Sequence, residues 1–164
     1  MPSDPRSGGP GIGADPGPVP AGHLVTEREI VGFARQWDPR PFHLDRAEAA
    51  TSVFGELVAS GLHILAASYR QWLDAEGLPG AMAGLGLDRV RWLRPVRPGD
   101  TLRVTGSAPT TRPTATPGRD VARVDLTTSD QHGRPVMTAT LVVLVGAAAP
   151  DGTAGPPTDQ HTDR

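Results

Sequence analysis

Residues 37–45 place the two side chains best suited to proton transfer on one short segment. Asp38 and His43 lie five residues apart, with Pro39 and Pro41 between them. Proline fixes φ and removes a backbone donor, so this segment is incompatible with the interior of a helix. We therefore predict a stiff, extended turn that holds a carboxylate and an imidazole in a fixed relation, as general acid–base catalysis requires.

Short helices are predicted on both sides of this turn. Thr26 and Glu29 have the spacing of a capping box, and apolar residues then recur at helical intervals. Pro39 ends that helix. After the turn, Asp45 is placed to cap a second short helix over residues 46–50.

A longer helix is predicted to begin at Gly61, with Ser60 as its cap and Gly77 as its natural stop. Its apolar residues cover much of the circumference, which predicts a central, buried helix.

The chain after Gly80 changes to a period of two, which is typical of strands. Residues 109–119 are rich in Thr and Pro and are expected to form a loop, and residues 130–133 a hairpin turn. Four strands are predicted: 85–92, with a break near Gly86, one beginning at 102, 121–128 and 135–145. This order of elements predicts an α+β fold in which an antiparallel sheet wraps one long helix.

The length and composition favour a single domain with non-globular ends. The chain has 164 residues, and residues 1–21 and 147–164 are rich in Pro, Gly and polar residues. We expect both ends to be disordered and residues 22–146 to fold as one domain.

Composition also excludes several kinds of chemistry. The chain has no Cys, which excludes disulfides and thiolate metal sites, and no Lys, which excludes Schiff-base catalysis. Sixteen basic residues nearly balance eighteen acidic ones, so no nucleic-acid partner is indicated. The His and Asp spacing indicates no metal site, and we expect no cofactor. The absence of a long apolar run and of a signal peptide predicts no membrane association and a cytoplasmic location.

Three segments in order carry a family likeness. Residues 38–43, 54–63 and 91–100 resemble the hydratase motif, the segment leading into the central helix, and the following strand and turn of one family. The chain therefore resembles the MaoC-like, or (R)-specific enoyl-CoA hydratase, branch of the hot-dog fold. One position departs from this pattern, because the usual Asn of the motif is Arg40 here.

The resemblance implies hydration of a 2-enoyl thioester, or dehydration of a 3-hydroxyacyl thioester, carried by coenzyme A or an acyl carrier protein. Asp38 would be the acceptor and orienting base for one water molecule, and His43 its proton-donating partner. The Gly61 N–H, at a helix N-terminus, would stabilise the charge that develops on the thioester carbonyl. A homodimer is also implied, because a single hot-dog unit leaves a sheet edge exposed.

Four further residues are assigned to substrate binding: Arg40, Ser60, His63 and Arg91. Arg40 could reach a carboxylate or phosphate of the substrate, and Arg91 the phosphates of the carrier. For His63 the alternative is a structural role, and for Arg91 a solvated sheet face.

Three other functions stay open at this point. A hot-dog thioesterase would use an acid near the central helix, and Glu56 is the only nearby candidate. A non-catalytic acyl-binding partner subunit of a hydratase would be expected to lack the Asp/His pair. A specialised biosynthetic dehydratase would act on a carrier-bound intermediate.

Overall fold

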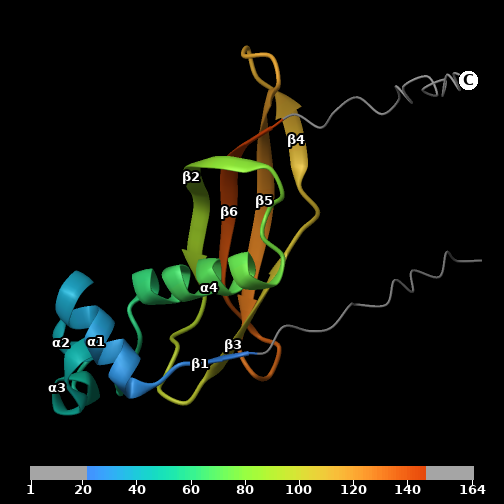
Figure 1. Cartoon of the computed structure of the whole chain (residues 1–164). Coiled ribbons are helices and arrows are strands. Elements are labelled where there is room, and N and C mark those ends of the chain that lie inside the picture. Colours follow the sequence, from blue (N-terminus) through green and yellow to red (C-terminus); the bar gives the residue numbers. More distant parts are fainter. Residues whose placement is uncertain (1–21, 147–164) are drawn as a thin grey trace, which may run out of the picture.

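The computed structural model describes residues 22–146, in which one long helix crosses a face of an antiparallel sheet (Figure 1). The six strands are β1 (His23–Leu24), β2 (Ala81–Trp92), β3 (Thr101–Gly106), β4 (Thr110–Pro113), β5 (Arg119–Ser129) and β6 (Pro135–Gly146). Their order is β1-β3-β5-β6-β2, and β4 pairs with β5 outside this path. The predicted disordered ends lie outside the described residues.

The long helix, α4 (Gly61–Ala75), is confirmed with its predicted cap, because the Ser60 side chain accepts from the Leu62 N–H. The helix ends before Gly77, whose φ of +58° favours glycine. No helix within residues 22–146 is both long enough and apolar enough to cross a membrane.

The core lies between α4 and the inner face of the sheet. Trp72 of α4 is buried against apolar side chains of the three central strands, among them Val124 and Leu141. Burying each such side chain contributes about 1.5–3 kcal/mol. The opposite side of α4 is not covered, since Leu62 and Leu73 are 47% and 45% exposed. The prediction of a central, buried helix therefore holds in the single chain for one face of α4, the face that the sheet covers.

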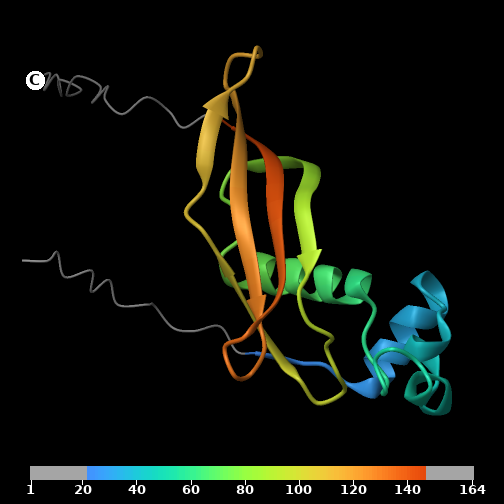
Figure 2. The same ribbon diagram turned by 180° about the vertical axis from the view of Figure 1, so that it is seen from behind.

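Three short helices gather at the N-terminal end of α4, as both ribbon views show (Figures 1 and 2). They are α1 (Glu27–Trp37), α2 (Pro41–Leu44) and α3 (Arg46–Ala50). Both hydrogen bonds of the predicted capping box are present at Thr26, and Asp45 caps α3 as predicted. The Arg46 guanidinium donates to the Glu27 carboxylate, which ties α3 to α1.

The segment between α1 and α3 differs from the prediction in its second half. Asp38 and Arg40 are non-helical, as expected, but α2 begins at Pro41 and includes His43. Proline is tolerated at the first position of a helix, because the N–H that it lacks would have no partner there. The prediction of an extended turn through His43 is therefore wrong, and the histidine sits on a short helical turn.

The Thr/Pro-rich segment also differs from the prediction. Thr110 pairs with Arg123 and Pro113 with Asp120, so β4 lies antiparallel to the first half of β5. The expected loop over residues 109–119 is wrong at this strand, because β-branched threonines fit the open edge that the long β5 leaves.

Candidate active site

The fold brings Asp38 and His43 together, as the sequence predicts. Asp38 caps the C-terminus of α1, and His43 lies on α2, one short connection away. The Asp38 Oδ2 atom is 3.4 Å from His43 Nε2, and the two side chains are only 14% and 6% exposed. A carboxylate and an imidazole thus face each other in a largely water-excluded position.

The hydrogen bond on the far side of the ring determines which nitrogen of His43 carries the proton. His43 Nδ1 lies 2.7 Å from the Val58 carbonyl oxygen, which can only accept. Nδ1 therefore donates, and in the neutral ring Nε2 is an unprotonated acceptor. Nε2 and Asp38 Oδ2 then form a pair of acceptors that can receive both hydrogens of one water molecule.

Ser60 connects this pair to α4. Its hydroxyl donates to Asp38 Oδ2 at 2.6 Å and accepts from the Leu62 N–H at 3.2 Å. The side chain is fully buried and is not among the residues that line the neighbouring pocket. In this structure Ser60 therefore orients Asp38 and caps the helix.

Gly61 lines the pocket at the first turn of α4. The Trp92 indole donates to the Gly61 carbonyl at 2.8 Å, and its ring lies 2.5 Å from where a Cβ atom on residue 61 would be. Only glycine fits against this ring. No hydrogen bond within residues 22–146 uses the Gly61 N–H, which leaves it available for a ligand at the positive end of the helix.

The pocket beside these groups has a volume of about 630 Å³. Most of its wall is apolar, with Asp38, His43, Arg40 and Arg94 as its charged or titratable members. The apolar lining includes Phe42, Phe54, Val58, Leu62, Ile64, Trp92, Leu93, Val96 and Val136. An apolar cavity with a few converging polar groups is typical of a small-molecule site.

Arg40, the residue that departs from the family pattern, is part of this site. Its Nε atom lies 3.0 Å from Asp38 Oδ1, while its side chain is 66% exposed. The guanidinium therefore borders both the Asp38 carboxylate and the pocket.

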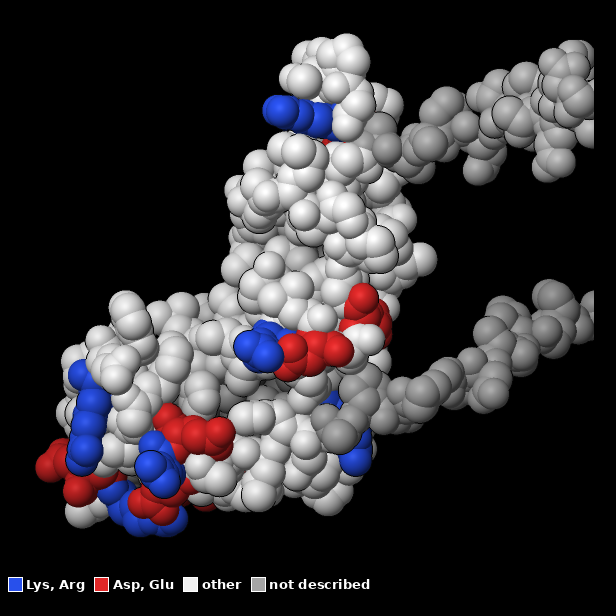
Figure 3. Space-filling view, viewed as in Figure 1, with Lys and Arg blue, Asp and Glu red and all other residues white. Residues whose placement is uncertain are grey.

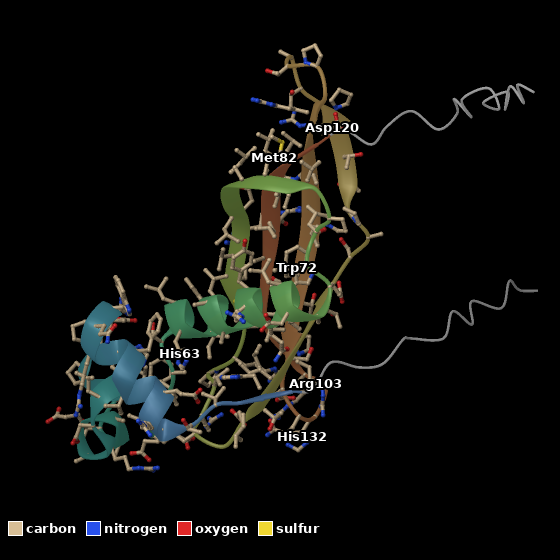
Figure 4. The ribbon with its side chains drawn as sticks, viewed as in Figure 1. His63, Trp72, Met82, Arg103, Asp120 and His132 are labelled. Carbon is tan, nitrogen blue, oxygen red and sulfur yellow. The ribbon has the colours of Figure 1, made fainter. Side chains whose placement is uncertain are left out.

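Besides Ser60, two more residues predicted to bind substrate do not line this pocket. His63 stacks on Phe33 of α1, with ring centroids 5.0 Å apart, and is not among the pocket-lining residues (Figure 4). Arg91 lines a separate hollow of about 370 Å³ on the other face of the sheet, together with Arg89 and Asp125. A role for Arg91 in binding carrier phosphates stays a prediction.

Two contributors to the site were missed by sequence reasoning. Val58 acts through its backbone carbonyl, which any residue type would supply, so the sequence holds no signal for it. Trp92 was assigned only to a strand, and its contact with Gly61 depends on how that strand passes the helix terminus.

The buried position of His63 has a consequence for stability. Burial lowers the pKa of His63, the Glu29 carboxylate opposes that shift, and His23 adds to it. Its Nδ1 atom is buried and has no partner within residues 22–146. The folded state therefore favours the neutral ring.

We expect the free energy of unfolding to fall as the pH falls below about 6.5, the usual pKa of this side chain. Between that value and the lower pKa of the folded state, the unfolded chain binds more protons, so acid favours unfolding. A His63→Phe variant should lose less stability between pH 7.5 and pH 5 in urea titrations. His132→Gln, in an exposed hairpin turn, is the control. Parallel pH profiles for wild type and His63→Phe would contradict this account.

Comparison with known proteins agrees with the fold. The sequence profile of the MaoC-like domain family matches residues 12–129. Protein MaoC of Klebsiella aerogenes is 38% identical over 81 residues, a match that covers 49% of this chain and 24% of that protein. The chain thus spans about a quarter of the length of this curated relative.

Two solved structures extend the comparison. A MaoC-like dehydratase from Rhodospirillum rubrum is 36% identical, with a TM-score of 0.71 over 79% of this chain and 89% of that chain. The R-hydratase PhaJ1 from Pseudomonas aeruginosa is 26% identical, with a TM-score of 0.60 over 82% and 88% of the two chains. With its long helix laid across an antiparallel sheet, the chain belongs to the MaoC-like dehydratase domain family and has the hot-dog fold.

Proposed function

We propose that this protein catalyses the reversible hydration of a 2-enoyl thioester, with Asp38 and His43 activating the water molecule. The observation that carries this proposal is the pair of acceptors, His43 Nε2 and Asp38 Oδ2, only 3.4 Å apart at the pocket. The similarity to an R-hydratase and to a MaoC-like dehydratase supports the same reaction class.

The geometry supports a simple sequence of proton movements. Water donates one hydrogen bond to Asp38, which orients it, and gives its other proton to His43 Nε2 as its oxygen bonds to C3. The electron pair of the C2–C3 double bond moves toward the thioester carbonyl, where the Gly61 N–H stabilises the developing negative charge. His43 then returns its proton to C2, which completes the addition of water and restores the neutral ring.

Coenzyme A and an acyl carrier protein remain alternative carriers of the substrate. The apolar wall of the pocket favours an acyl chain, and neither a metal nor a cofactor is needed for this sequence of steps. The cytoplasmic location also stays a prediction.

The test is to follow loss of the enoyl absorbance of crotonyl-CoA together with release of free thiol. Absorbance loss without thiol release is the expected result. Thiol release without hydration would favour a thioesterase, although the candidate acid Glu56 is paired with Arg97 and does not line the pocket. Activity only with a carrier-protein thioester would favour the biosynthetic dehydratase, and no activity with either would favour a non-catalytic subunit.

We also propose that the protein forms a homodimer through the edge of β2. This strand ends the sheet order, and its Met82, Leu85 and Leu87 are 43–55% exposed. Figure 3 shows charged side chains gathered over the helical end, while the surface over β2 has few of them. Trp92 at the end of the same strand lines the pocket, so a second copy on this edge would border the site.

Analytical ultracentrifugation of the wild type is expected to give a mass of two chains. A Leu85→Lys variant should shift the mass toward one chain, because it places a charge in an apolar interface. Leu24→Lys is the matched control, because Leu24 is equally exposed, at 54%, but lies on β1 at the opposite edge of the sheet. A wild-type mass of one chain would contradict the dimer.

A further inference from the structure

We propose that Arg40 selects thioesters whose acyl group carries a carboxylate close to the double bond. This inference rests on the proposed function, because it names the substrate class of the same site. Three features support it: the position of the Arg40 guanidinium, the short distance between that group and the reaction centre, and the charge of the pocket.

Arg40 is free to bind a ligand with most of its donors. It occupies the cap position of α2 but makes no side-chain cap hydrogen bond, so its side chain can turn back toward Asp38. The closest contact of the ion pair with Asp38 is made by Nε, and within residues 22–146 the two terminal nitrogens of Arg40 make no hydrogen bond. A guanidinium carries five N–H donors in a planar fork, which allows it to bind two carboxylates at once.

The position of Arg40 limits where its anion can lie. One oxygen of Asp38 contacts Arg40 Nε at 3.0 Å, and the other faces His43 Nε2 at 3.4 Å. The guanidinium is therefore separated from the reacting water by the width of one carboxylate. The phosphates of coenzyme A or of a phosphopantetheine group are separated from the thioester by a long flexible arm. An anion held by Arg40 beside the reaction centre therefore belongs to the acyl group.

The charge of the pocket favours the same ligand. Arg40 and Arg94 line it with only Asp38 as an acid, and within residues 22–146 no ion pair involves Arg94. A neutral acyl chain leaves this excess of positive charge uncompensated. A carboxylate compensates it in a partly apolar cavity, where charge-assisted hydrogen bonds are stronger than in water.

The experiment compares kcat/KM for two CoA thioesters of the same shape, the monothioester of trans-butenedioate and its methyl ester. Wild type should prefer the free carboxylate. Arg40→Gln should reduce that preference on the order of 10- to 100-fold, the effect of losing a hydrogen bond to a charged group. Arg70→Gln is the matched control, because it removes the same charge from an exposed site on α4 and should leave the preference unchanged.

Further measurements separate this inference from its alternatives. N-acetylcysteamine thioesters lack phosphates, and the preference for the free carboxylate should persist with them. If Arg40→Gln changed this preference only with CoA thioesters, the anion bound by Arg40 would lie on the carrier, which would overturn the inference. Equal losses for both acyl groups in Arg40→Gln would also overturn it, since Arg40 would then only position Asp38.

Calorimetric binding of saturated butanedioyl-CoA and butanoyl-CoA tests Arg40 without turnover. If wild type binds the acidic thioester more tightly and Arg40→Gln loses this difference, the result supports the inference even without turnover. Absence of hydration for every thioester would contradict only the proposed function. Hydration of crotonyl-CoA without any preference in binding or turnover would contradict only the role of Arg40.

Discussion

Replacing Asp38 by Asn is expected to slow hydration of crotonyl-CoA on the order of 100- to 10,000-fold, the range that a positioned acid–base group contributes. Asn keeps the shape of the side chain but loses one acceptor and the negative charge. The water molecule then has one oriented hydrogen bond fewer, and the imidazolium that forms has no counter-charge. Steady-state kinetics with circular dichroism as a folding control measure the effect.

The companion variant is His43→Asn, which separates the two nitrogens of the imidazole. The Asn amide can still donate to the Val58 carbonyl, as His43 Nδ1 does, so the buried acceptor keeps its partner. The basic Nε2 is removed, and a loss as large as that of Asp38→Asn is expected.

Residues that act on one water molecule are not additive, so the double variant should be little slower than either single variant. Wild-type rates in Asp38→Asn and His43→Asn would end the catalytic assignment. Losses that multiply in the double variant would indicate two independent roles.

The second large effect is expected for Gly61→Ala. The new Cβ atom would lie 2.5 Å from the Trp92 ring, so the indole must leave its position on the Gly61 carbonyl. Both the pocket wall and the first turn of α4 then shift, and the Gly61 N–H, the proposed donor to the thioester carbonyl, is displaced. We expect kcat/KM to fall on the order of 100- to 1000-fold, as for loss of one oxyanion donor.

Gly32→Ala is the matched control for this variant. A Cβ atom at Gly32, on α1, meets nothing within 4 Å, so this change should only add helix propensity, up to about 1 kcal/mol. Tryptophan fluorescence should change in Gly61→Ala and not in Gly32→Ala. Unchanged kcat/KM in Gly61→Ala would show that the thioester carbonyl is not bound at this helix end.

The sequence predicted α1, α3 and α4 well because the ends of these helices carry local signals. The Thr26 capping box, the Asp45 cap and the Ser60–Gly61 start each involve residues that contact one another within a few positions. The break near Gly86 is likewise confirmed as a shift in the pairing of β2 with β6. Such features depend on neighbours in the chain, which a sequence displays directly.

Features that depend on distant contacts were not predictable in the same way. The pairing of β4 exists only because β5 extends past β3, its partner on that edge, and leaves the edge open there. The proton position on His43 depends on the Val58 carbonyl, fifteen residues away and independent of side-chain type. The exposure of Leu62 and Leu73 shows that the apolar circumference of α4 includes surface that one chain does not bury.

Ser60 and Gly61 are neighbours in the chain, yet in the proposed mechanism they act at opposite ends of the reacting enoyl thioester. The Ser60 hydroxyl holds the Asp38 carboxylate, which orients water in the proposed mechanism, and the next peptide unit carries the Gly61 N–H that we propose for the carbonyl. The distance between the Ser60 hydroxyl and the Gly61 N–H is therefore set by covalent geometry rather than by packing. Substitutions that change which acyl group the pocket accepts are then expected in its outer wall, where Arg40 and Trp92 lie. Such substitutions leave the spacing between Ser60 and the Gly61 N–H intact.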